Sequence, residues 1–176
     1  MNDPTITPAS QRIEGVRVKK LPVIADERGR LTIFMRSDDN LFERFGQVYT
    51  STAFPGVIKA WHFHRKQVDH LCALCGKIRL VLYDCRNEKL GFGHQGEASM
   101  TSGLINEFIM TPENPLLVKI PAMVLHGIQN IGEKESMILN VTNIAYQNDN
   151  PDVFRLTFDD KVIPWKWPKT NQKLNT

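Results

Sequence analysis

The sequence predicts an all-β barrel formed by one domain. Short segments rich in β-branched and aromatic residues follow one another through the middle of the chain, and several alternate apolar with polar side chains. Turn-forming stretches such as DERG, FPG, CGK and TPENP separate these segments. No repeat of about 20–50 residues and no low-complexity linker divides the chain. Short strands with regularly spaced turns are typical of sandwiches and barrels.

The expected strands can be taken in chain order. RLTIFMR follows the DERG turn, GQVYTSTAF and VIKAWHF flank FPG, and HLCALC and KIRLVLYD flank CGK. LLVKIP follows TPENP, and HGIQNI and SMILNVTNIAY flank GEKE. We expect helical or irregular structure only in SDDNLFERFG and around residues 101–110. One domain would span residues 1–176, with an N-terminal arm at about 1–12 and a C-terminal segment at about 151–176 packed on the barrel.

The segment KIRLVLYD indicates a closed barrel. On a strand, Ile78, Leu80 and Leu82 face one side and the residues between them face the other. A barrel interior lined by apolar and a few polar side chains is a natural pocket for a small ligand.

The composition excludes several classes of protein. Hydrophobic residues make up 41% and charged residues 23%, as in ordinary globular domains. The net charge of +3 is small and the basic residues are scattered, which argues against a nucleic-acid-binding protein. No apolar run reaches the roughly 18 residues of a membrane span, and the N-terminus lacks a signal-peptide pattern. Cys72, Cys75 and Cys85 do not suggest disulfides, so we expect a cytoplasmic protein with reduced thiols.

The stretch GVIKAWHFHRKQVDHLCALCG, residues 56–76, concentrates the chemistry. His62 and His64 are two residues apart, so both point to one face of a strand, and Asp69 follows after a short turn. A second block, IPAMVLHGIQN, contributes His126 and Asn130. These residue types suit metal binding, proton transfer or polar filling of a barrel.

The two blocks resemble the paired motifs of the cupin superfamily, whose fold is a double-stranded β-helix, or jelly-roll barrel. Aspartate stands where that family usually has glutamate, and Met123 stands where the second motif usually has glycine. In many cupins the two histidines, the acid and the last histidine bind one divalent metal. By that resemblance His62, His64, Asp69 and His126 would hold Fe, Mn, Ni or Zn.

A longer resemblance covers residues from about 22 to 168. This part of the chain is similar to the dTDP-4-dehydrorhamnose 3,5-epimerases and related nucleotide-sugar epimerases. The similar segments are FGQVYTS, GVIKAWHFH, GKIRLVLYDCR, VKIPAMVLHGIQN and FRLTFDDKVIPWKWP. That family is a metal-independent cupin, so the resemblance implies no cofactor and a nucleoside-diphosphate sugar as ligand. It also implies a homodimer in which N-terminal strands cross between subunits.

The reaction of that family needs a base and an acid. In a 4-keto sugar the protons at C3 and C5 lie α to the carbonyl and become removable when the enolate is stabilised. By the resemblance His62 is the general base, His126 lines the same pocket, and Asp159 or Asp160 orients the base.

The resemblance also implies substrate contacts. Arg28 matches an arginine near the diphosphate, Gln47 a polar residue of the ligand groove, and Lys59 an arginine in the family's RGxH motif. Lysine keeps the charge there but not the bidentate grip. Near the N-terminus, Leu31 and Ile33 align with the family's phenylalanine and glutamate.

Three pocket positions depart from the family pattern. His64 stands where glutamine is usual, and Asp69 aligns near a lysine associated with the keto oxygen, whose charge His70 would have to replace. Asn140 aligns with the tyrosine that serves as the acid, and asparagine cannot exchange a proton at physiological pH. Inversion at one carbon, with water or another group as donor, is therefore favoured over inversion at two.

We therefore predict a nucleotide-sugar epimerase or isomerase that acts on an NDP-4-keto-6-deoxy sugar in polysaccharide biosynthesis. His62 would be catalytic with Asp159 or Asp160, and the substrate contacts would be Arg28, Gln47, Lys59, His64, Asp69, His126 and Asn140. Two alternatives stay open: a metal-dependent cupin enzyme and a sugar-nucleotide-binding cupin without catalysis.

Overall fold

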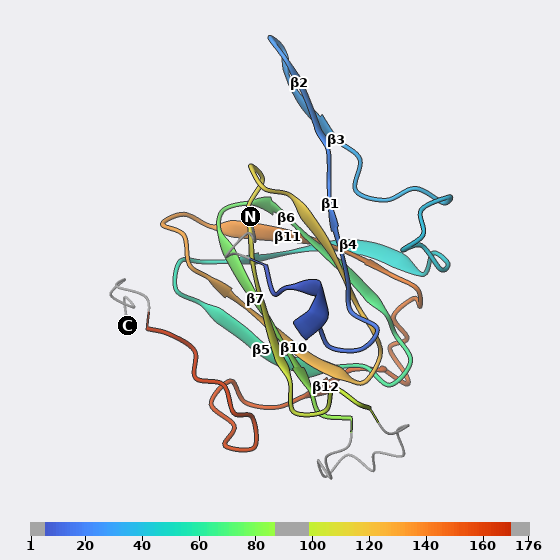
Figure 1. Ribbon diagram of the computed structural model, residues 1–176, viewed down its shortest axis with the longest axis vertical. Coiled ribbons are helices and arrows are strands. Elements are labelled where there is room, and N and C mark those ends of the chain that lie inside the picture. Colours follow the sequence, from blue (N-terminus) through green and yellow to red (C-terminus); the bar gives the residue numbers. More distant parts are fainter. Residues whose placement is uncertain (1–5, 87–98, 170–176) are drawn as a thin grey trace.

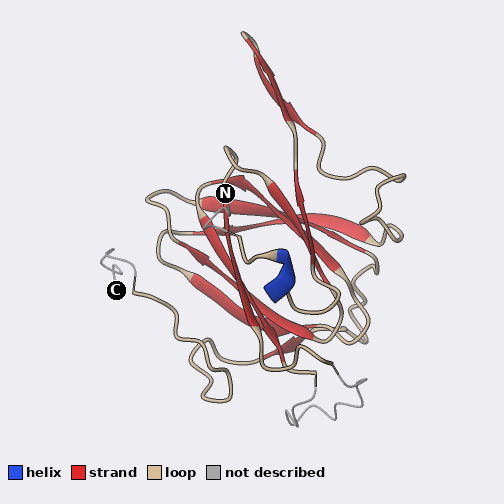
Figure 2. Cartoon of the chain, in the orientation of Figure 1, coloured by secondary structure: helices blue, strands red, loops and turns tan. Residues whose placement is uncertain are grey.

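The computed structural model describes residues 6–86 and 99–169, which form an almost entirely antiparallel β structure (Figure 1 and Figure 2). One 3-10 turn, η1 (Ala9–Gln11), precedes the sheets. The strands are β1 (Arg17–Lys20), β2 (Val23–Asp26), β3 (Gly29–Thr32), β4 (Gln47–Ala53), β5 (Ile58–Phe63), β6 (Asp69–Cys75), β7 (Ile78–Asp84), β8 (Ile105–Met110), β9 (Leu116–Ile120), β10 (Val124–Asn130), β11 (Ser136–Thr142) and β12 (Phe154–Arg155). The predicted all-β fold is confirmed.

Two five-stranded sheets face each other and form the barrel. The first has the strand order β1-β9-β6-β11-β4, and the second has the order β12-β5-β10-β7-β8. From β4 to β7 and again from β9 to β11, the chain passes repeatedly from one sheet to the other. This connectivity is that of a jelly roll, in agreement with the predicted cupin barrel.

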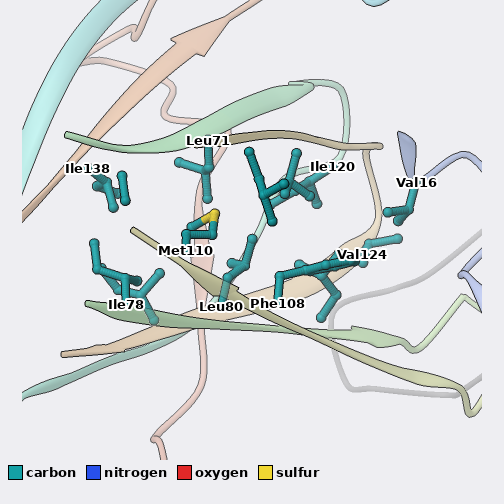
Figure 3. Packing of buried hydrophobic residues seen from close by; sticks show 14 of the residues in the cluster. Val16, Leu71, Ile78, Leu80, Phe108, Met110, Ile120, Val124 and Ile138 are labelled. Carbon is teal, nitrogen blue, oxygen red and sulfur yellow. The ribbon is translucent and has the colours of Figure 1, made fainter. Parts of the chain in front are cut away.

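The interior of the barrel is apolar over much of its length (Figure 3). Ile78, Leu80 and Leu82 of β7 pack there with Phe108 and Met110 of β8. The other face of β7 is also buried, because it packs in a second cluster beneath the C-terminal segment. The alternation predicted for β7 is therefore confirmed, and apolar side chains cover the strand on both faces.

The C-terminal segment covers the outer face of the second sheet. After β12, Leu156 and Trp61 exchange two backbone hydrogen bonds, of 2.9 and 3.0 Å. Further along, Trp167 packs against Trp61 with ring centroids 5.1 Å apart, and Ile163 and Trp165 join the same cluster. This packing holds the end of the described chain on the outside of the barrel.

The hairpin of β2 and β3 projects from the barrel (Figure 1). Val23, Ile24, Leu31 and Ile33 on and beside it are large apolar residues that are exposed to solvent. Grouped exposed apolar side chains on a projecting element mark a surface that binds another molecule.

Two local predictions need correction. Residues 105–110 form β8, not a helical or irregular segment, because the strand pairs along β7 and buries Phe108 and Met110. The strand expected in RLTIFMR ends at Thr32, where the hairpin ends. We expected helical or irregular structure in SDDNLFERFG. The segment contains turns and no helix, so it is irregular. No helix in the described part of the chain is long and apolar enough to cross a membrane.

Candidate active site

Polar side chains from both sheets gather in one pocket of the barrel. β5 brings His62 and, just after its end, His64, whereas β10 brings His126 and β11 brings Asn140. His62 and His126 are direct partners in the β5–β10 register, with ring centroids 6.0 Å apart. The two sequence blocks therefore meet in space, and both β5 histidines point to the same side as the spacing predicted.

Asp69, the first residue of β6, connects this group. Its side chain is buried, and Oδ1 accepts hydrogen bonds from Gln67 Nε2 at 2.8 Å and from Asn140 Nδ2 at 2.7 Å. Its Oδ2 lies 3.4 Å from His64 Nε2 and 3.7 Å from His126 Nε2. The Asp69 carboxylate thus occupies the space between two amides and two imidazoles, not a solvated turn.

His64 and His126 both direct a lone pair toward Asp69. Nδ1–H of His64 donates to the carbonyl of Asp152, and Nδ1–H of His126 donates to the carbonyl of Val124 at 3.2 Å. Since a carbonyl only accepts, the hydrogen of each neutral ring is on Nδ1 and Nε2 is unprotonated. Two imidazole lone pairs and a carboxylate oxygen that face one another create a place for a cation or a shared proton.

These three side chains could hold a metal ion. Their ligand atoms all lie within 4.8 Å of one another, and metal-bound histidines commonly donate their other ring N–H to a carbonyl, as both do here. His62 does not belong to this group. The structure therefore fits a ligand set of His64, Asp69 and His126, which corrects the four-ligand set suggested by the cupin motif.

His62 has a different environment. Its ring faces a cavity of about 300 Å³, and its nitrogens have no hydrogen-bond partner within residues 6–86 and 99–169. Burial, followed by the nearby His126 and Arg155, lowers the pKa of His62 to about 4. The imidazole is therefore neutral at physiological pH and has a lone pair available to take a proton.

Three further side chains line the same cavity and were missed from the sequence. Tyr49 and Ser51 come from β4, on the face that also carries Gln47, and Arg155 comes from β12, directly opposite His62 in the register. Alternation along β4 from Gln47 would have placed both β4 residues in the pocket. Arg155 could not be found in that way, because a two-residue strand shows no alternation.

Lys59 also lines this cavity. Its Nζ donates a hydrogen bond of 3.1 Å to Ser51 Oγ, which links β5 in the second sheet to β4 in the first. Lys59 and Arg155 thus supply two cationic groups near His62.

A second cavity of about 520 Å³ adjoins the first. Gln47 lines it, and Gln47 Oε1 accepts a hydrogen bond of 2.9 Å from the backbone N–H of Tyr146. Tyr49, His64 and Arg155 line both cavities. The two cavities share these walls, and together this groove is large enough for a ligand of several rings.

The structure does not bring Asp159 or Asp160 to His62. The chain turns there, with Asp160 N–H donating to the carbonyl of Thr157 at 3.1 Å and Asp160 Oδ1 accepting from Val162 N–H at 3.0 Å. Both aspartates line a hollow beside Trp165 and Trp167 that His62 does not line. The structure therefore does not bring the expected base–carboxylate pair together, and the carboxylate that acts on the pKa of His62 is Asp69, which raises it.

Two other residues also lie elsewhere. Arg28 is in the turn between β2 and β3, the hairpin that projects from the barrel (Figure 1), and contacts Asp26 at 2.5 Å; it lines neither cavity. The ring nitrogens of His70 are hydrogen-bonded to the carbonyls of Val141 and Leu41, at 3.0 and 2.9 Å. His70 lines neither of the two cavities, so it is not placed to replace the lysine that the family pattern has near Asp69.

A jelly-roll barrel that surrounds a neutral histidine with cations and a buried carboxylate defines a cupin with a site for an anionic small molecule. The chain belongs to the family described as "Polysaccharide biosynthesis C-terminal domain", which matches residues 24–154.

Individual relatives agree with this family. The spore coat polysaccharide biosynthesis protein SpsL of Bacillus subtilis is 40% identical over 155 residues, which is 88% of this chain and 96% of that protein. The probable low-salt glycan biosynthesis epimerase Agl13 of Haloferax volcanii is 34% identical over 157 residues, 88% of this chain and 94% of that protein.

A solved structure agrees as well. The dTDP sugar isomerase from Desulfovibrio desulfuricans is similar with a TM-score of 0.78 and 29% identity, over 88% of this chain and 92% of that one. The predicted resemblance to nucleotide-sugar epimerases is confirmed.

Proposed function

We propose that the protein is a nucleotide-sugar epimerase that acts on an NDP-4-keto-6-deoxy sugar in polysaccharide biosynthesis. The observation that carries this proposal is His62, a neutral imidazole with an available lone pair that faces a cavity beside Lys59 and Arg155. A base next to cations suits removal of a proton α to a ketone, because the cations stabilise the enolate that forms.

The groove accommodates the two halves of such a substrate separately. The 4-keto sugar would occupy the inner cavity, where His62 reaches its α-carbon and Lys59 or Arg155 neutralises the enolate oxygen. The nucleoside diphosphate would extend into the adjoining cavity past Gln47 and Tyr146. A bound diphosphate would raise the pKa of His62 toward neutrality, which makes it a stronger base in the complex than in the free protein.

We further propose that the protein is a cytoplasmic homodimer. The β2–β3 hairpin projects from its own barrel and exposes Ile24 and Leu31, so it can dock on a second copy. Arg28 at its tip would then reach the partner's groove and contact the diphosphate. The free thiols of Cys72, Cys75 and Cys85 support a reducing compartment.

Solvent exchange tests the proposed function. Purified protein is incubated in deuterated water with 4-keto-6-deoxy hexoses linked to dTDP or UDP, and label and configuration are read by mass spectrometry and NMR. We expect deuterium at one carbon α to the ketone and an inverted product, both lost in His62→Asn. Binding without exchange above the His62→Asn background would favour the non-catalytic sugar-nucleotide-binding cupin.

A metal-dependent enzyme is the second candidate, because His64, Asp69 and His126 converge with the correct tautomers. A divalent metal bound there would act as a Lewis acid toward the keto oxygen. Metal analysis of purified protein tests it: one equivalent of Fe, Mn, Ni or Zn, lost in His64→Ala and Asp69→Asn but kept in His62→Asn, would establish this candidate. No metal above background in protein that performs the exchange would refute it.

A further inference from the structure

We propose that Tyr49 is the catalytic acid of this site and returns a proton to the substrate carbon on the face opposite His62. This inference rests on the proposed epimerase function and names a residue for its second half-reaction. Inversion requires that one group remove a proton from one face of the sugar and that another deliver a proton to the other face.

The first argument is position. His62 comes from β5 in the second sheet and Tyr49 from β4 in the first, and both line the same cavity. A sugar held between the two sheets therefore has the imidazole on one side and the phenol on the other. Ser51, on the same face of β4, is already hydrogen-bonded to Lys59.

The second argument is the direction of the Tyr49 hydroxyl. Asn140, the register partner of Tyr49 on β11, donates from Nδ2 to Tyr49 Oη at 2.9 Å. The amide orientation is fixed, because the N–H of His70 donates to Asn140 Oδ1 at 3.1 Å. The Tyr49 oxygen therefore accepts from Asn140, and its own hydrogen remains for a ligand in the cavity.

The third argument is that Asn140 cannot perform the transfer itself. One of its amide hydrogens is donated to Tyr49 and the other to Asp69. An amide also does not exchange a proton at physiological pH. Asn140 is therefore a positioning residue, and the acid role that its alignment suggests passes to the neighbouring strand.

The protonation state of Tyr49 suits a donor. Burial raises the pKa of Tyr49, the hydrogen bond from Asn140 opposes that rise, and the negative charge of Asp69 adds to it. The phenol therefore carries its proton at neutral pH. Tyr49 also lines the adjoining, larger cavity and is 41% exposed, so water can reach it.

The proton balance closes without any further reagent. His62 takes the proton as the C–H bond breaks, and the electron pair moves onto the keto oxygen as the enolate. The enolate collapses onto the proton of Tyr49, which forms the new C–H bond and leaves a phenolate. Water then returns a proton to Tyr49 and removes one from His62, so the sugar is isomerised with no net oxidation.

Comparison of exchange with inversion tests the role of Tyr49. The probe is dTDP-4-keto-6-deoxyglucose, or its UDP-linked counterpart, in deuterated water. In Tyr49→Phe we expect inversion to fall by roughly 10²-fold or more, while deuterium still enters the substrate with its configuration retained, because His62 can return a deuteron to the same face. Tyr83→Phe, which alters a buried tyrosine of β7 that lines neither cavity, is the matched control and should leave both rates unchanged.

The outcomes separate this proposal from the function on which it rests. Inversion by Tyr49→Phe at the wild-type rate would overturn the acid role and leave the epimerase function intact. Absence of both exchange and inversion in the wild-type protein would overturn the epimerase function itself. Should Tyr49→Phe fold poorly by thermal unfolding, Tyr49→His supplies another proton donor, and partial inversion in that variant would support the proposal while exchange without inversion would contradict it.

Discussion

His62 on β5 and His126 on β10 are register partners whose rings lie 6.0 Å apart, and His126 is one of the groups that lower the pKa of His62. Arg155, the partner of His62 on β12, acts in the same direction. Burial and a group on each neighbouring strand therefore all oppose protonation of His62.

The pH profile should report this arrangement. We expect kcat/KM of the free protein to fall on the acid side only near pH 4, the pKa of His62. Removal of a neighbouring positive charge favours the protonated ring, so Arg155→Gln should raise that pKa and move the acid limb to higher pH. The measurement is kcat/KM for solvent exchange between about pH 3 and pH 8, a range that covers the limb near pH 4 and the usual titration range of histidine. An acid limb that does not move would indicate that another group is the base.

The buried network around Asn140 should contribute to stability. Asn140→Ala removes the partners of the His70 N–H, Asp69 and Tyr49, so we expect the free energy of unfolding to fall by about 2–4 kcal/mol. Gln67→Ala removes the 2.8 Å hydrogen bond to Asp69 and the 3.3 Å contact to His64, and should cost about 1–2 kcal/mol. Urea denaturation of both variants measures the difference. Equal losses would contradict the central place given to Asn140.

The C-terminal aspartates can be tested as partners of His62. Neither Asp159 nor Asp160 contributes to the pKa of His62 in the described part of the chain, so Asp159→Asn and Asp160→Asn should leave the acid limb of kcat/KM in place. A nearby carboxylate favours the protonated ring, and its removal would lower the pKa. A shift of the limb to lower pH in either variant would therefore restore the role predicted from the sequence.

Mixed dimers can test whether Arg28 acts on the partner's groove. We expect Arg28→Ala and His62→Asn to be strongly impaired when each is measured alone. When equal amounts are unfolded and refolded together, half of the dimers are mixed, and each has one intact site of two. Activity should then recover to about one quarter of the wild-type value. No recovery would show that Arg28 serves its own chain, whereas full activity of Arg28→Ala measured alone would show that Arg28 has no role.

Local patterns in the sequence predicted most of the barrel and the centre of the pocket. The His-x-His spacing places His62 and His64 on one face because alternation is a property of the strand itself. Asp69 and His126 could be predicted for a different reason, because each lies at the position that a recurring motif specifies. Met123 has a φ of 66°, which explains why the related motif favours glycine there.

The site predictions failed where the position of a residue depends on the path of the chain between strands and not on a local pattern. Asp159 and Asp160 follow β12, and the pairing of Leu156 with Trp61 carries them to the outer face. Alternation from Gln47 places Tyr49 in the pocket, but the role that we propose for it depends on its contact with Asn140 of β11. Such contacts between distant strands leave no periodic signal.

The projecting hairpin has a consequence for how much enzyme is needed. If Arg28 on the hairpin of one subunit completes the groove of another, an isolated subunit lacks one of its contacts to the diphosphate at any substrate concentration. Activity per chain would then depend on how many chains are present, because dilution removes the arm from each groove. A change in the amount of this protein in the cell would then change the supply of sugar precursors by more than the same factor.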